Sequence, residues 1–323
     1  MRGRYEIIIG TNRVTYELCI NRSLTVINGD SATGKTVLYD LVTAVANKRQ
    51  GVSVRINPVD TSNIPNLNVL TDSNWKLIAE NTTNTIFFID EYARFIFSDE
   101  FSNLLKGNDN YYVMIIRHYS DLKGLPLSIN EIYDVVSSGK HHILKSRYVN
   151  RYIKGKDLKV SDLPTYITED KGSGRSFFKY ATGSDKVIGA EGNGDVLNKL
   201  IGVLSLNNDS LVIIADAAAF GVYIEDLLQV LNRVNRNINL LLPESFEYLI
   251  LSTSMFYGRN LYSTNPYIAL DCKKYKSWER FYTETLELCA KQFGFSYSKR
   301  RGIPNKLKND IVKTEVLCML NLI

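Results

Sequence analysis

Two glycines, a lysine and a threonine near the N-terminus have the types and spacing needed to hold a phosphate group. Gly29 is followed by four residues, and then come Gly34, Lys35 and Thr36. Glycines let backbone N–H groups turn inward around a phosphate, and a helix that begins here directs its positive end at the same place. The lysine can reach the terminal phosphates of a nucleotide, and the threonine hydroxyl can bind Mg²⁺. The predicted phosphate loop consists of Gly29, Asp30, Ser31, Ala32, Thr33, Gly34, Lys35 and Thr36.

The residues on both sides of this loop are typical of a strand and a helix. The stretch 24–27 is mostly apolar, and apolar residues recur at helical spacing after the loop, at Val37, Leu38, Leu41, Val42 and Val45. Strand, glycine-rich turn and helix is the context that the P-loop, or Walker A, pattern G-x-x-x-x-G-K-S/T requires. A chance glycine-rich turn would not need this context, so we interpret the loop as a nucleotide site.

A second group of candidate residues ends the apolar run at 85–91, TIFFIDE. Consecutive apolar residues indicate a strand that is buried on both faces of a parallel sheet. Asp90 could hold Mg²⁺ together with Thr36, and Glu91 could polarise an attacking water as a general base. The alternative is a core strand that ends in two surface acids. Because the chain already has the phosphate loop, we interpret the run as a Walker B motif, and the absence of an N-K-x-D motif at a strand end favours ATP over GTP.

The elements around these motifs predict an α/β first domain over residues 1–160, with a mostly parallel sheet and an N-terminal antiparallel hairpin. Residues 60–72 are expected to form a polar loop, and Ser73 is expected to cap a helix that ends at residue 81. The other predicted strands are 5–9, 14–20, 52–56, 111–116, 131–137 and 142–148.

The order of these motifs resembles the end of the nucleotide-binding domain of ABC-type ATPases. After IFFIDE come MIIRHYSDL and EIYDVVSSGKHHIL. In that family the Walker B strand precedes a strand that ends in a switch histidine and a strand pair with a Gly-Lys turn. The resemblance gives His118 a catalytic role beside the γ-phosphate, whereas a surface histidine is the alternative. The sequence has no LSGGQ-like segment and no glutamine loop, so the resemblance covers the catalytic core alone.

Positive charge concentrates between residues 140 and 159, although the whole chain has a net charge of only +5. Cations interleaved with Tyr148 and Tyr152 suit the phosphate backbone and the unstacked bases of DNA. The sequence leaves three alternatives open: a solvated basic face, a surface for a protein partner, and a cation from Arg147, Arg151 or Arg175 that reaches a neighbouring subunit of a homo-oligomer. The cations of the segment are Lys140, Lys145, Arg147, Arg151, Lys154, Lys156 and Lys159.

Strands and helices alternate again in the second half of the chain. Residues 162–175 contain Pro164 and a Gly-Ser-Gly run and predict a linker. Beyond it we expect a second, smaller α/β domain within residues 161–323, closed by helices at 277–293 and 311–322. Its predicted strands and helices are 186–190, 195–204, 211–215, 223–234, 238–242 and 245–251.

Two stretches of this second domain resemble a TOPRIM domain, the metal-dependent module of topoisomerases, primases and OLD-family nucleases. Glu191, Gly192 and Asp195 match its E-G-x-x-D pattern, and Asp216 matches the first acid of its D-x-D pattern. Ala218 stands where the second acid is expected, so the domain is read as degenerate. The resemblance implies an OLD- or RecF-like ATPase of the kind found in mobile elements and phage defence, with a second metal site at Glu191 and Asp216.

Composition excludes disordered and membrane-spanning classes. The 323 residues are 45% hydrophobic and 23% charged, without a signal peptide or an apolar run of membrane length. We therefore expect a cytoplasmic protein with no membrane partner, and reduced core cysteines at Cys19, Cys272, Cys289 and Cys318. Three functions fit: an ATPase that drives a conformational switch, a nucleotide-gated regulatory protein with negligible turnover, and a Mg²⁺-dependent nuclease.

Overall fold

The computed structural model describes residues 1–28, 33–122, 124–148, 151–257, 265–275 and 277–323. It is an α/β protein with two sheets, each in its own unit: Met1–Tyr148 with Asn265–Ser277, and Val149–Thr264 with Trp278–Ile323. This division differs from the predicted boundary at residue 160, because β10 (Arg151–Lys154) pairs with β14 (Ile238–Leu241) of the second sheet. The first unit also gains 265–277, where Cys272 N donates to Met1 O at 3.0 Å.

The first unit is built on a mixed sheet of nine strands, in which parallel pairs predominate on the side of the predicted phosphate loop. The predicted N-terminal antiparallel hairpin is confirmed, and a third antiparallel strand follows at its edge. In sheet order the strands are β4 (Ser53–Pro58), β1 (Tyr5–Gly10), β2 (Thr15–Ile20), β9 (His141–Ser146), β8 (Ile132–Ser138), β3 (Leu24–Asn28), β7 (Tyr111–Ile115), β6 (Thr85–Ile89) and β5 (Asn66–Leu70).

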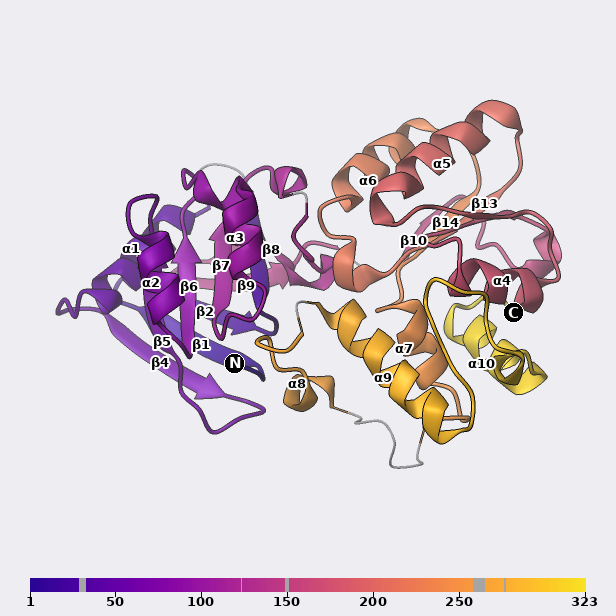
Figure 1. Cartoon of the computed structure of the whole chain (residues 1–323). Coiled ribbons are helices and arrows are strands. Elements are labelled where there is room, and N and C mark those ends of the chain that lie inside the picture. Colours follow the sequence, from indigo (N-terminus) through magenta and orange to yellow (C-terminus); the bar gives the residue numbers. More distant parts are fainter. Residues whose placement is uncertain (29–32, 123, 149–150, 258–264, 276) are drawn as a thin grey trace. The chain divides into compact units, whose positions relative to one another are not determined.

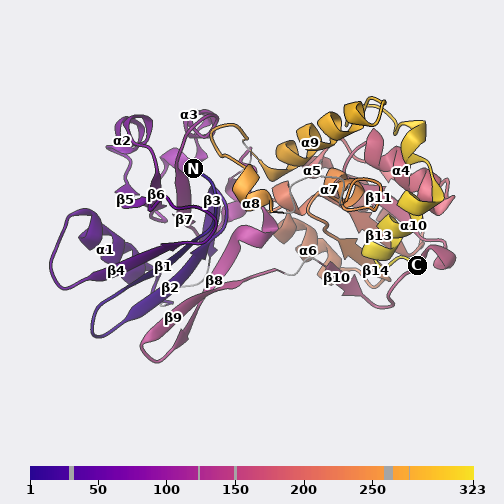
Figure 2. The ribbon, with the colours of Figure 1, turned by 90° about the horizontal axis from the view of Figure 1, so that it is seen from below.

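The β8–β9 hairpin lies between the N-terminal hairpin and the strand that precedes the phosphate loop. β9 pairs with β2 in parallel, and β8 pairs with β3 in parallel. Figure 2 shows β4, β1, β2, β9 and β8 next to one another in this order. Two segments distant in the sequence, β2 and β9, are therefore neighbours close to the start of α1 (Lys35–Ala46).

Different side chains fill the two faces of this sheet. On one face α1 buries Leu38 and Val42 in a mixed aliphatic and aromatic core with residues of β1, β3, β6 and β7. On the other face five aromatic rings pack in stacked and edge-to-face pairs, each worth about 0.5–1.5 kcal/mol beyond its buried area. These rings belong to Trp75, Phe87, Phe95, Phe101 and Tyr112. Both faces of the central strands are covered, which explains why every residue of β6 and β7 is buried and most are apolar.

Two predictions in the first unit are wrong. The stretch 60–72 is not a loop throughout, since β5 pairs in parallel with β6 over its whole length. Its asparagines lie on a half-exposed edge strand, where polar residues are tolerated. The following helix, α2 (Trp75–Asn81), has Asn74 and not Ser73 at its N-cap, and neither side chain caps it: Ser73 Oγ lies 3.0 Å from Thr71 Oγ1, and Asn74 Oδ1 accepts from Thr71 N at 2.9 Å.

The second unit has a five-stranded sheet whose order is β10, β14, β13 (Leu211–Ile214), β11 (Thr165–Thr168) and β12 (Val187–Gly189). All neighbours are parallel except β10 and β14. The predicted linker at 162–175 is wrong, because β11 lies within it and pairs with two other strands. All four of its residues are buried, so this segment belongs to the core.

Helices cover both faces of the second sheet (Figure 1). α5 (Asn193–Leu206) and α6 (Ile224–Arg233) lie on one face. The opposite face holds α4 (Ser173–Thr182), α7 (Phe246–Leu251), α9 (Trp278–Gln292) and α10 (Asp310–Met319). Cys272 and Cys289 are buried as predicted, but Cys19 and Cys318 are exposed on a sheet surface and a helix surface, and all four are free thiols.

Candidate functional site

The predicted phosphate loop begins after β3 and ends in the first turn of α1. Gly29, Asp30, Ser31 and Ala32 lie outside the described residues, and the structure describes Thr33, Gly34, Lys35 and Thr36. Gly34 has φ +88°, and a Cβ at this position would lie 2.6 Å from Tyr16 Oη. The same hydroxyl donates to Gly34 O at 2.7 Å, so glycine is required here both by the backbone and by the neighbouring tyrosine.

This requirement can be tested by comparing two glycines that share a backbone conformation. Gly51 also has φ +88°, but a Cβ there meets nothing within 4 Å. Gly51→Ala should destabilise the protein by about 1–2 kcal/mol through the left-handed backbone alone. Gly34→Ala adds the collision with Tyr16, so it should lower the thermal unfolding midpoint more than Gly51→Ala does. The Gly34→Ala, Tyr16→Phe double variant lacks the colliding hydroxyl and should recover part of the lost midpoint. Equal losses for the two single variants would show that Tyr16 does not restrict Gly34.

Lys35 is the buried cation of this region. It is 7% exposed, and its Nζ donates to Thr33 Oγ1 at 3.0 Å. A buried ammonium is unfavourable unless nearby oxygens replace water, and Thr33 Oγ1 is one such oxygen. Lys35 and Thr36 line a cavity of about 420 Å³ together with Asp90 and Glu91. The structure therefore brings the two predicted motifs to one place.

Asp90 and Glu91 reach the cavity because they follow β6, which is separated from β3 by a single strand, β7. The two carboxyl groups have opposite environments. Burial raises the pKa of Asp90, and the neighbouring Glu91 charge adds to this. The pKa of Glu91 is lowered, because Arg117 Nε and Nη2 donate to its two carboxylate oxygens at 2.8 and 3.2 Å and Lys35 contributes a further positive charge. Adjacent acids in distinct environments can take distinct roles.

Arg117 and His118 follow β7, but they differ in position. Arg117 lines the cavity of Lys35, whereas His118 is exposed and lines an adjacent hollow of about 290 Å³. Glu91 and Arg117 line both spaces. The structure therefore places His118 next to the Glu91–Arg117 pair and not in the wall around Lys35.

Sequence reasoning did not find three of the side chains at this site. In the sequence, Arg117 is only one of several polar residues that follow a predicted strand. Tyr16 and His142 come together because β2 and β9 pair in register, and their rings stack with centroids 4.5 Å apart. Ser137 Oγ lies 2.7 Å from His142 Nδ1 and fixes the ring beside Gly34. Strand pairing over this distance in the sequence leaves no local pattern that would identify the two residues.

The second unit brings together a different set of acids from the predicted one. Asp216 follows β13 and groups with Glu169, which follows the adjacent β11, and with Glu279 of α9. Glu191 is not in this group. Its exposed carboxylate pairs with Lys171, and its N–H donates to Asp195 Oδ2 at 3.1 Å. The predicted Glu191 and Asp216 pair is thus replaced by Glu169 and Asp216, since the strand that positions Glu169 was taken for a linker.

Burial controls the ionisation of this acid group. Desolvation raises the pKa of Glu169 well above its ordinary range and that of Asp216 to about 7. The nearby Lys299 ammonium opposes both shifts, while burial also raises the pKa of Glu247. Asp216 is held by Phe246 N, which donates to Oδ1 at 2.9 Å, and Glu169 Oε2 accepts from Asp216 N at 2.8 Å.

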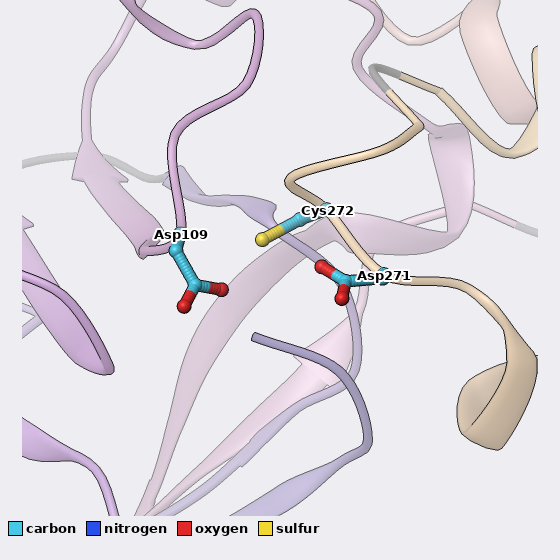
Figure 3. A group of neighbouring side chains, drawn as sticks. All are labelled: Asp109, Asp271 and Cys272. Atoms are coloured by element: carbon cyan, nitrogen blue, oxygen red, sulfur yellow. The ribbon is translucent and has the colours of Figure 1, made fainter.

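A third group of metal-type ligands, Asp109, Asp271 and Cys272, lies in the first unit (Figure 3). The α-amino group of Met1 is among them: it donates to Cys272 Sγ at 3.4 Å, lies 3.7 Å from Asp271 Oδ1 and pairs with Asp109. Burial raises the pKa of the Cys272 thiol, and a protonated thiol is a poor metal ligand. These residues therefore serve to attach residues 265–277 to the first unit.

The basic segment between residues 140 and 159 is divided between the two units. Most of its cations are engaged in contacts within their own unit. Arg147 pairs with Asp134, Arg151 with Asp157 and Lys156 with Asp162, while Lys154 and Lys159 donate to backbone carbonyls. Arg175 Nε likewise donates to Val187 O at 3.1 Å. These contacts fix the positions of these side chains within each unit, and a DNA or protein partner for the segment stays a prediction.

Comparisons with family models, curated proteins and solved structures gave no match. Among the described residues, no helix combines the length and the apolar character that crossing a membrane requires.

Proposed function

We propose that the first unit binds ATP with Mg²⁺ and hydrolyses it, and that this turnover drives a conformational switch. One observation carries the proposal: Lys35, Thr36, Asp90 and Glu91 line the same cavity although they come from two motifs far apart in the sequence. A cation, a hydroxyl and two carboxylates that follow two buried strands of one sheet are the groups that phosphoryl transfer requires.

Each of these residues has a separate task in the proposed reaction. The Lys35 ammonium balances the charge of the terminal phosphates. Thr36 and Asp90 would hold Mg²⁺, which when bound neutralises charge on the phosphates. Glu91 orients a water molecule whose oxygen forms a bond to the γ-phosphorus while the bond to the ADP oxygen breaks. The proton released by the water passes to the Glu91 carboxylate.

Arg117 restrains Glu91 in the described structure, since both carboxylate oxygens accept hydrogen bonds from its guanidinium. Arg117→Ala should lower turnover by about tenfold to a hundredfold, because the carboxylate loses its orientation and the cavity loses a cation. Arg117 lowers the pKa of Glu91, so its removal raises that pKa and moves the acid limb of the kcat/KM profile to higher pH. Arg117→Lys keeps the charge but loses the paired hydrogen bonds and should show an intermediate rate. An unchanged pH profile in Arg117→Ala would show that the pair does not tune the catalytic group.

Two measurements on the purified protein test the proposal. Equilibrium binding of ATP in the presence of Mg²⁺ examines the cavity, and release of inorganic phosphate examines hydrolysis. Binding with phosphate release supports an ATPase. Binding without release contradicts turnover and favours the nucleotide-gated regulatory protein, whereas absence of binding at millimolar ATP contradicts both.

A further inference from the structure

The acid group of the second unit surrounds a lysine. Glu169, Asp216 and Glu279 each present a carboxylate oxygen, and these atoms lie within 4.8 Å of one another. They come from the ends of two adjacent parallel strands and from the first turn of α9. Oxygens from separate elements at this spacing form the kind of set that binds Mg²⁺ or Mn²⁺.

The ammonium group of Lys299 lies among these oxygens. Its Nζ is 2.6 Å from Glu279 Oε1, 3.0 Å from Asp216 Oδ2 and 3.7 Å from Glu169 Oε1. The backbone at this position is also fixed, because Lys299 O accepts from Ser173 N at 3.1 Å. One ammonium group therefore contacts three carboxyl groups. It lies where a divalent ion bound by these three groups would lie.

A fourth carboxyl group, that of Glu247, belongs to the surroundings of Lys299. Glu247 is fully buried and interacts electrostatically with Lys299. Its Oε1 accepts from Tyr297 Oη at 2.7 Å, and Tyr297 Oη lies 2.8 Å from Ser173 Oγ. Its Oε2 is buried and has no hydrogen-bond partner among the described residues. Burying carboxylates is strongly unfavourable unless a cation or protons neutralise them, so the group requires Lys299.

We propose that the Lys299 ammonium takes the place of a divalent cation in this acid group, so that the second unit folds with an internal cation and binds a divalent ion there only when the amine is removed. Lys299 has a positioning role: it holds the ends of β11 and β13 against α9.

The test compares Mn²⁺ binding by the full chain with that of Lys299→Met, in which the side chain keeps its approximate length and loses its charge. Mn²⁺ is titrated without nucleotide and followed by the loss of the free-ion signal in electron paramagnetic resonance. We expect the variant to bind one more Mn²⁺ per chain than the wild type, about tenfold or more tightly than any site of the wild type. Mn²⁺ should raise the thermal unfolding midpoint of the variant and leave that of the wild type unchanged.

Three further variants locate the extra ion. Asp216→Asn in the Lys299→Met background should remove the additional Mn²⁺, Lys299→Arg should bind none, and the exposed Lys306→Met should behave as the wild type. If Lys299→Met does not fold without metal, recovery on refolding in millimolar Mn²⁺ supports the proposal and lack of recovery contradicts it. The proposal is also overturned if folded Lys299→Met binds no additional ion, or if the wild type binds Mn²⁺ at a site that Asp216→Asn removes.

Discussion

Replacing Lys35 with alanine is expected to weaken ATP binding by the full chain strongly. The Lys35 side chain is 7% exposed and lines the cavity that holds the other predicted phosphate and metal ligands. A triphosphate in that cavity would face an ammonium from which water is largely excluded, and truncating one partner of such a pair costs about 2–5 kcal/mol. This range corresponds to a Kd for ATP that is about 30-fold to several thousand-fold weaker. Isothermal titration with a slowly hydrolysed ATP analogue and Mg²⁺ measures the change.

A matched control separates this effect from a general loss of positive charge. Lys76 is 54% exposed and forms a surface pair with Glu100, so Lys76→Ala removes the same charge far from the cavity and should leave ATP binding unchanged. Circular dichroism shows whether Lys35→Ala keeps its secondary structure. A folded Lys35→Ala protein that binds ATP like the wild type would exclude this cavity as the triphosphate site.

The sequence was sufficient to predict the central strands of the first sheet and two interior strands of the second, β13 and β14, because each has a strong local signal. The consecutive apolar residues of β6 and β7 are buried on both faces, as parallel strands covered on two sides must be. The β8–β9 hairpin was predicted from its Ser-Gly-Lys turn, and Gly139 at this turn has φ +61°. Alternating strands and helices likewise predicted the α/β class of the second unit.

The elements that the sequence does not predict are those whose structure depends on contacts with distant parts of the chain. β11 is only four residues long, and a polar, glycine-rich turn follows it directly. In the sequence this interior strand therefore resembles part of a loop. Because the sequence does not predict β11, it does not indicate Glu169 as a candidate acid. The motif match indicates the exposed Glu191 instead. A motif match to Glu191 and Asp195 could not show that their contacts form a local turn at the start of α5.

At the predicted nucleotide site, too, contacts that depend on strand order have no signal in the local sequence. Residues next to one another in the sequence, such as Lys35 and Thr36, were found from their spacing. Arg117 was not, because its relation to Glu91 depends on β6 and β7 being neighbours in the sheet. Site residues that follow a recognisable strand or turn can therefore be read from the sequence, whereas their hydrogen-bond partners depend on strand order.

Replacing Glu91 with glutamine is expected to stop ATP hydrolysis while ATP binding is retained. Glutamine has the shape of glutamate but cannot accept the proton of the attacking water, so turnover should fall by about 10²- to 10⁴-fold. Binding depends on Lys35, Thr36 and the loop backbone, which the substitution leaves in place. Phosphate release under saturating ATP measures turnover, and titration with ATP measures the Kd on the same samples.

The substitution also shows whether Arg117 acts through Glu91. If it does, Arg117→Ala should have a smaller effect on turnover in the Glu91→Gln background than in the wild type, because the group it orients is already inactive. Additive losses would instead assign Arg117 an independent contact with the phosphates. Glu100→Gln, an exposed glutamate of α3 (Asp99–Leu104), is the control and should hydrolyse ATP normally. If Glu91→Gln retained full turnover, the general base would have to be another group, and Asp90 is the remaining carboxylate that lines the cavity among the described residues.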